Sequence, residues 1–256
     1  MTDLRKKLIL ITNDDGLHAC GINKLIETIA PLGKIVVVAP NGPRSGMSSA
    51  ITSTNPIRVT LLKEEEDLKI YACTGTPVDC VKIGIDRLLP RKPDLLVSGI
   101  NHGSNAAVAV IYSGTVGAAL EGCIIGVPSL AVSLTDHSLN TNFSEAAKYG
   151  KSVAEKVLKE GLPKGICLNL NIPNIPKVNG LKVCTQTTGH WTKEFEEMQD
   201  PSGRNVYWLT GEFFNEDPGN VNNDEWALTN GYAALVPLHI DMTAYNFIEQ
   251  IKKWEE

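Results

Sequence analysis

The stretch "ILITNDDG", residues 9–16, carries the apolar run of a strand straight into two neighbouring acids, Asp14 and Asp15. The run is typical of a strand covered on both faces, and Gly16 gives the chain freedom to turn after it. Side-by-side carboxylates repel each other, and burying them without a positive partner is costly. Two interpretations remain open: the acids are ordinary turn and helix-capping residues, or a cation lies between them.

Similar apolar runs recur through the first half of the chain. They cover residues 6–12, 34–40, 94–100 and 128–134. Helical patterns lie between and after them, at residues 20–32, 77–89, 113–124 and 143–161. Thr76, Pro77 and Asp79 form a capping box with a proline at the first helical position. Strands that alternate with helices in this way predict an α/β fold, a doubly wound and mostly parallel sheet with helices on both faces.

The second half has shorter, more β-like segments separated by Gly, Asn and Pro. We expect strands at residues 165–173, 181–187 and 205–211, with an exposed excursion or hairpin at 190–204. A short helix, a strand and a terminal helix are expected over residues 224–256. The chain shows neither an internal repeat nor a low-complexity linker. We therefore predict one unit over residues 1–256, with a site-bearing core at 1–135 and a C-terminal extension at about 185–256.

Composition narrows the classes of function. The formal net charge of −5 offers no basic surface for a nucleic-acid duplex. No run reaches the roughly 18 apolar residues of a membrane span. The six cysteines lie at irregular spacings and form no Cys-x-x-Cys pair, which is typical of reduced thiols in a cytoplasmic protein rather than of a zinc or redox motif.

Three loops follow predicted strands and should meet at one edge of the sheet, because carboxyl ends of parallel strands lie together. They are residues 13–16, 40–52 and 98–122. Their functional groups are carboxylates, hydroxyls and side-chain amides, without a Cys–His cluster. Hard oxygen ligands of this kind favour Mg²⁺ or Mn²⁺ over Zn²⁺.

Several polar residues in these loops have both a structural and a functional interpretation. Ser113 or Thr115 can cap the helix that follows, and the same hydroxyls with the helix N–H groups can cradle a phosphate. Asn101 and Asn105 are typical of loop-stabilising amides. His102 fits a loop histidine better than a catalytic base, and Arg44 fits a surface charge better than a phosphate clamp.

Taken in order, the motifs resemble the SurE family of metal-dependent 5′/3′-nucleotidases. The matching stretches are "ILITNDDG", "VVAPNGPRSGMSSAIT", "TGTPVDCV", "PDLLVSGINHGSN", "YSGTVGAALEG" and "DEWALTNGYAALVPLHID". They span most of the chain. The resemblance implies a Rossmann-like core and a C-terminal β-hairpin and helix extension used in homodimer or homotetramer contacts.

The resemblance also assigns site residues. One divalent metal ion per subunit would be held by Asp14, Asp15, Ser45 and Asn101. The catalytic group would comprise Asp14, Asp15 and Asn13. Phosphate or substrate would contact Asn13, Gly46, Asn105, Ser113, Gly114 and Thr115.

The implied reaction is hydrolysis of nucleoside 5′-monophosphates, with 3′-monophosphates and short polyphosphate as further substrates. Water would attack phosphorus with metal assistance; Asp14 or Asp15 could take its proton, and His102 is a weaker candidate for protonating the leaving group. A phosphatase with an Asp-x-Asp-Gly nucleophile is a poorer match, because Asp14 and Asp15 are adjacent. The alternative, a Mg²⁺-binding receiver-like signalling module, would need a phosphorylatable aspartate after its third strand.

Overall fold

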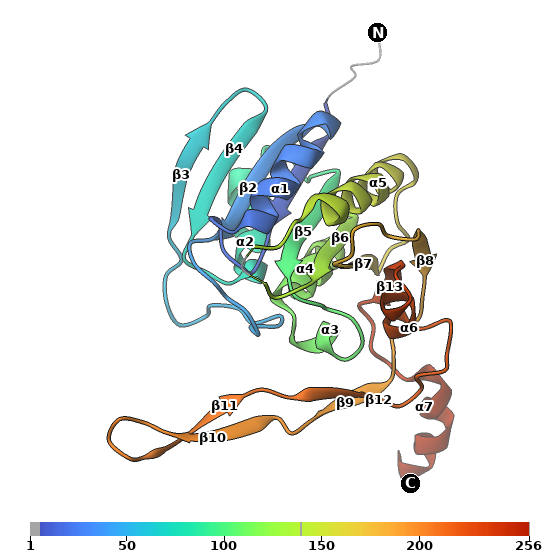
Figure 1. Ribbon diagram of the computed structural model, residues 1–256. Helices are drawn as coiled ribbons and strands as arrows, with labels where there is room; N and C mark the ends of the chain where they lie inside the picture. Colours follow the sequence, from blue (N-terminus) through green and yellow to red (C-terminus); the bar gives the residue numbers. More distant parts are fainter. Residues whose placement is uncertain (1–5, 139, 256) are drawn as a thin grey trace.

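The computed structural model describes residues 6–138 and 140–255; residues 1–5, 139 and 256, which the predicted unit includes, lie outside it. Within the described residues a nine-stranded sheet runs through the protein (Figure 1). Its strands are β1 (Leu8–Thr12), β2 (Lys34–Pro40), β3 (Val59–Glu64), β4 (Leu68–Cys73), β5 (Leu95–His102), β6 (Ser129–Thr135), β7 (Ile166–Pro173), β8 (Leu181–Val183) and β13 (Ala233–His239). They lie in the order β3-β4-β2-β1-β5-β6-β7-β13-β8.

The six strands from β4 to β7 are mutually parallel, which confirms the predicted fold class. β3 joins antiparallel to β4, and β13 antiparallel to β7, while β8 pairs parallel with β13. Sequence patterns did not predict β3 and β4. Most of their residues are half-buried or exposed, and they join through the acidic run at 64–67, so they lack the continuous apolar signal of the central strands.

Side chains of successive residues in the central strands pack into two different hydrophobic cores, one on each face of the sheet. In β1, Ile9 and Ile11 face one core while Leu8 and Leu10 face the other, as expected for a strand covered on both sides. Helices α1 (Cys20–Ile29) and α5 (Ser144–Glu160) pack together over the first core. Helices α2 (Pro77–Ile83) and α4 (Gly114–Ile125) pack together over the second. Each large aliphatic side chain buried in these layers contributes about 1.5–3 kcal/mol.

Side-chain caps fix where two of these helices begin. The predicted capping box of α2 is present: Thr76 Oγ1 accepts from the N–H of Asp79 (3.1 Å), and the N–H of Thr76 donates to Asp79 Oδ2 (2.9 Å). Helix α4 starts after Ser113, whose Oγ accepts from the N–H of Val116 (3.0 Å). The two predicted helices that proved shorter continue in other helical turns, η1 (Ala30–Leu32) after α1 and η2 (Gly84–Leu88) after α2.

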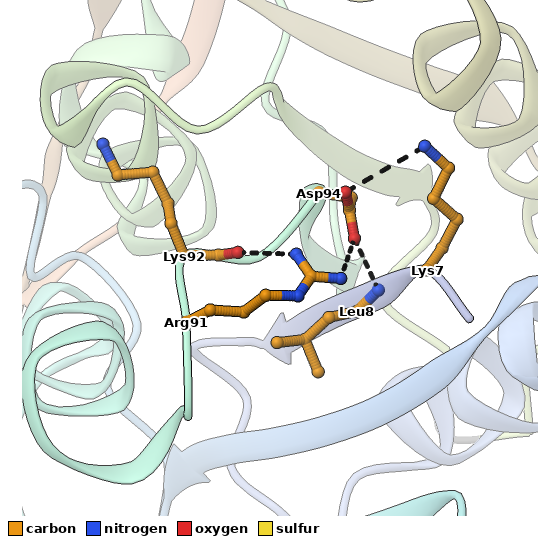
Figure 2. Close-up of polar contacts among 5 residues, drawn as sticks. All are labelled: Lys7, Leu8, Arg91, Lys92 and Asp94. Atoms are coloured by element: carbon orange, nitrogen blue, oxygen red, sulfur yellow. Dashed lines mark hydrogen bonds and ion pairs between the residues drawn. The ribbon is translucent and has the colours of Figure 1, made fainter. Parts of the chain in front are cut away.

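Asp94, which directly precedes β5, links the amino ends of β1 and β5. Its Oδ2 accepts from the N–H of Leu8 and from Arg91 Nη2, both at 2.7 Å, and Lys7 Nζ lies 4.0 Å from Oδ1 (Figure 2). Arg91 Nη1 is held in turn by the carbonyl oxygen of Lys92 (3.0 Å). Burial alone would raise the pKa of Asp94, but these donors and cations outweigh it and lower the pKa.

The C-terminal half completes the sheet and adds a long arm. β9 (Gly189–Thr192) pairs with β12 (Glu212–Asn215), and β10 (Phe195–Gln199) pairs with β11 (Asn205–Leu209). Together they form one projecting hairpin (Figure 1), which confirms the predicted excursion at 190–204. The strand expected at 205–211 is its return strand, and the one expected at 181–187 is shortened to β8.

The remaining helices are short. They are α3 (Ala109–Tyr112), between β5 and α4, and α6 (Asp224–Thr229), α7 (Tyr245–Ile251) and the terminal turn η3 (Lys252–Glu255) in the C-terminal segment. Within residues 6–138 and 140–255, no helix has the length and apolar character needed to cross a membrane.

Candidate active site

The tight turn after β1 brings both acids to the carboxyl edge of the sheet. Asn13 is fully buried, and its Nδ2 donates to the carbonyl oxygen of Gly16 (2.9 Å), closing the turn. Gly16 has φ +95°, a conformation that favours glycine. Beyond the turn, Asp15 Oδ2 accepts from the N–H of His102 at the end of β5 (3.0 Å). The regular strand ends at Thr12, so alternation does not force the two carboxylates apart.

Asp14 lies against the N-terminus of α4. Thr115 donates twice to its carboxylate, from the hydroxyl to Oδ1 (2.5 Å) and from the N–H to Oδ2 (3.2 Å). A Cβ added at Gly114 would lie 3.0 Å from both Cβ and Oδ2 of Asp14, so glycine permits this close approach. The positive end of the helix dipole thus faces a carboxylate. The donors expected to cradle a phosphate at Thr115 are in this structure directed at Asp14.

The two carboxylates are electrostatically strained. Burial raises the pKa of Asp14, although the hydrogen bonds from Thr115 oppose this rise. Burial and then the charge of Asp14 raise the pKa of Asp15 to about 6. Within the described chain, neither carboxylate has a lysine or arginine partner. A cation bound between them would relieve both the repulsion and the desolvation cost.

Neutral oxygen donors lie near these acids. The N–H of Arg44 donates to the carbonyl oxygen of Asp14 (2.7 Å), which holds the loop of Ser45 and Gly46 beside it. Asn101 Nδ2 donates to the carbonyl oxygen of Gly103 (2.9 Å), which leaves Oδ1 as the side-chain atom that could bind a metal. The β5–β6 register shifts between Ser98 and Asn101, and such an irregularity re-aims the strand end.

This donor set fits a hard divalent cation. In the described part of the chain, no group of three or more His, Cys, Asp or Glu side chains is arranged to hold a metal. A metal here would therefore rest on two carboxylates completed by the Ser45 hydroxyl and the Asn101 carbonyl, together with water. Asn13 Oδ1 is buried and, among the described residues, has no hydrogen-bond partner, so a further acceptor oxygen lies beside the acids.

A cavity of about 510 Å³ opens over this edge of the sheet. Six of the predicted site residues line it: Asp14, Ser45, Gly46, Asn101, Asn105 and Ser113. The other four are adjacent in sequence to lining residues or within two positions of them but do not line the cavity themselves: Asn13, Asp15, Gly114 and Thr115. The Arg44 guanidinium donates to the carbonyl oxygen of Thr74 (3.1 Å), in keeping with a structural role.

His102 and His137 form a pair at the cavity wall. Both line the cavity, and their ring centroids are 6.3 Å apart. His102 Nε2 is buried, and the described residues offer it no hydrogen-bond partner. The geometry therefore keeps His102 as a candidate proton donor and adds His137, which sequence reasoning did not single out.

Buried amides on β7 hold the Asn105 loop. Asn171 Oδ1 accepts from the N–H of Asn105 (2.8 Å), and Asn169 Nδ2 donates to the Asn105 carbonyl oxygen (2.9 Å). The Asn105 side chain donates to Ser133 Oγ (2.8 Å). Asn169 and Asn171 were missed from sequence. Two asparagines at alternate positions of an apolar strand are the signal that could have revealed them, since they share one face.

Asp224 ties the same loop to the C-terminal segment. It is fully buried, and its Oδ2 accepts from the N–H of Ala107 (2.9 Å). Its Oδ1 accepts from the N–H (3.0 Å) and the hydroxyl (2.6 Å) of Thr187. Sequence patterns gave no signal for Asp224, because an acid at the start of a helix is ordinarily explained by the helix dipole.

Comparisons with known proteins point to one family. A family model described as survival protein SurE matches residues 9–193. A protein of Bacteroides fragilis named 5′-nucleotidase SurE is 48% identical over 251 residues, 98% of each chain. One of the same name from Christiangramia forsetii is 49% identical, covering 98% of this chain and 97% of its own. The crystal structure of the SurE protein from Aquifex aeolicus superposes with a TM-score of 0.84 at 39% identity, over 97% of this chain and 100% of that chain.

Proposed function

The chain belongs to the family of survival protein SurE, and on this premise we propose that it is a metal-dependent 5′-nucleotidase. It would hydrolyse nucleoside 5′-monophosphates to nucleoside and inorganic phosphate. The observation that carries the proposal is the pair of adjacent carboxylates, Asp14 and Asp15, one held by Thr115 and the other by the N–H of His102. Asp14 lines a cavity of a size typical of small-molecule sites, and Asp15 is its neighbour in the chain.

The proposed metal site uses Asp14, Asp15, Ser45 and Asn101, with one Mg²⁺ or Mn²⁺ per subunit. When bound, such an ion lowers the pKa of a water molecule and offsets charge on the phosphate. Both carboxylate oxygens of Asp14 accept hydrogen bonds from Thr115, whereas only Oδ2 of Asp15 accepts one, from the N–H of His102. We therefore assign Asp15 as the acceptor of the proton released by the attacking water.

The chain's other residues would bind and orient the phosphate. Ser113 Oγ accepts from Val116, so its own proton is free to donate into the cavity, which Ser113 lines. Gly46 and Asn105 line the same cavity. Water attacks phosphorus in line, the bond from phosphorus to the nucleoside oxygen breaks, and His102 is the candidate to return a proton to that oxygen.

The test replaces each carboxylate by its amide. We expect Asp15→Asn to lower phosphate release from AMP at least about a hundredfold, the usual range for losing a general base, and Asp14→Asn to lower it by removing a charged metal ligand. Asp86→Asn is the matched control, since that side chain is 71% exposed and pairs only with its neighbour Arg87 among the described residues. Near-wild-type rates in both site variants, with unchanged dependence on added metal, would refute the assignment.

The proposal also covers further substrates and the identity of the metal ion. We propose activity on 3′-monophosphates and on short polyphosphate as well, supported by the family resemblance. A panel of nucleoside 5′- and 3′-monophosphates and tripolyphosphate, run with Mg²⁺ and with Mn²⁺, measures each activity. The receiver-like alternative finds no support: Asn101 and His102 end β5, where a receiver needs its phosphorylatable aspartate.

Exposed apolar side chains support an assembly. They lie on the projecting hairpin and on the C-terminal helical turns α7 and η3, and include Phe195, Tyr207 and Trp254. Exposed patches of this kind mark contact surfaces. We propose a homodimer or homotetramer that uses these two elements.

A further inference from the structure

The projecting hairpin contributes to the cavity at the break in its strand pairing. We call residues 191–194 and 209–212 the hairpin elbow, where the β9–β12 pair gives way to the β10–β11 pair. Trp191, Glu194, Leu209 and Thr210 of this elbow line the cavity that also holds Asp14 and Asn101. A segment expected only to make oligomer contacts therefore forms one wall of the candidate active site.

The elbow is held in place by its own contacts. The N–H of Thr210 donates to the carbonyl oxygen of Glu194 (2.8 Å), and Lys193 Nζ pairs with Glu212 (2.8 Å). The Trp191 ring packs edge-on against Phe213, with centroids 5.7 Å apart. Trp191 is thus a pre-positioned aromatic surface, which lowers the entropy lost when a ligand packs on it.

A second aromatic residue and an acid line the cavity together with Trp191. Tyr112, 55% exposed, lines the cavity just before Ser113 at the start of α4. The lining therefore combines the hydroxyls, amides and Asp14 of the proposed phosphate and metal site with the aromatic and apolar surface of Trp191, Tyr112 and Leu209. The Glu194 carboxylate repels a phosphate group, so a flat uncharged ring suits its surroundings best.

We propose that Trp191, together with Tyr112, forms the surface on which the nucleobase stacks, so that the hairpin elbow determines the preference for nucleotides over base-free phosphate esters. The inference rests on the proposed nucleotidase function. Stacking is tolerant of base identity because every base presents a π face. The elbow would therefore bind both purines and pyrimidines. Purines would bind more tightly, because their larger ring system offers more surface for stacking.

The test compares AMP with ribose 5-phosphate, which carries the same phosphate ester without a base. We expect Trp191→Ala to raise KM for AMP by roughly 5- to 150-fold, the range that losing one stacking contact gives, and to leave kcat/KM for ribose 5-phosphate unchanged. Trp191→Phe should restore most of the affinity for AMP, because it keeps an aromatic face. Trp208→Ala is the matched control: the same residue type on the same hairpin, 62% exposed and outside the cavity lining.

Equal effects of Trp191→Ala on the two substrates, or no effect on either, would overturn the inference. Failure of the proposed function is a separate result, in which wild-type protein releases phosphate from neither substrate. Direct binding then still decides the inference. AMP titrated into wild type should bind more tightly than ribose 5-phosphate and change the tryptophan fluorescence. That change should be lost in Trp191→Phe and retained in Trp208→Phe; any other pattern contradicts the stacking role.

Discussion

Replacing Thr115 by valine tests how the proposed metal site is supported. Valine has nearly the same shape as threonine, so the fully buried pocket keeps its packing. The change removes the hydroxyl that donates to Asp14 Oδ1 at 2.5 Å, while the N–H to Oδ2 bond at 3.2 Å remains. Asp14 would then have a carboxylate oxygen without its donor, in a place where it is only 3% exposed to solvent.

The expected magnitude follows from that single bond. A hydrogen bond to a charged group contributes about 1.5–3 kcal/mol. Losing a partner that orients a metal ligand costs about 10- to 100-fold in metal affinity or activity. At about 1.4 kcal/mol per tenfold change, these two ranges agree. We therefore expect Thr115→Val to weaken Mg²⁺ or Mn²⁺ binding about 10- to 100-fold.

The assay is calorimetric titration of metal into wild type, Thr115→Val and Thr115→Ser, with AMP hydrolysis measured alongside. Serine retains the hydroxyl and should bind metal close to wild type, although it loses a buried methyl group. Equal metal affinity in the valine and serine variants would refute the reasoning, because it would mean that the hydroxyl does not hold Asp14 in its ligating position.

Three further predictions follow from other contacts. Gly114→Ala should lower AMP hydrolysis about tenfold or more with little change in thermal unfolding, since its Cβ would press on Asp14 at 3.0 Å; wild-type kinetics would contradict this. Asp94→Asn should reduce the free energy of unfolding in urea by about 1–2 kcal/mol at pH 7. Because folding lowers the pKa of Asp94, this difference should vanish as pH falls below about 4 and through the folded pKa; a loss that persists in acid would contradict the ion-pair origin. A chain ending before residue 243 keeps β13 in the sheet and should sediment as a smaller assembly, with its circular dichroism reduced only by the helical signal of α7 and η3; monomers in both forms would remove the oligomer proposal.

Central elements were predictable because their chemistry is local. The apolar run that includes Ile9 and Ile11 is continuous because β1 is covered on both faces, and the capping box at Thr76 is complete within four residues. The grouping of the loops also followed from sequence, since parallel strands place their carboxyl ends together.

The remaining features depend on partners far away in the chain. β3 is the edge strand of the sheet and β4 lies next to it; β3 is mostly exposed and β4 mostly half-buried, so the burial signal of both is weak. Thr115 turning onto Asp14 involves residues 101 positions apart, which no local pattern encodes. Trp191 lines the cavity from the hairpin elbow, and the elbow is fixed by cross-strand contacts rather than by composition.

The contact of Asp224 with Ala107 has a consequence for how the protein is made. Asp224 follows Ala107 by 117 residues, and it holds the loop that comes after Asn101. On a ribosome adding about 5–20 residues per second, a nascent chain would display Asp14, Asp15 and this loop well before Asp224 emerges. The growing polypeptide would therefore lack this anchor until the segment of Asp224 has been synthesised. Completion of the cavity wall at Asn105 would then be a late event in biogenesis.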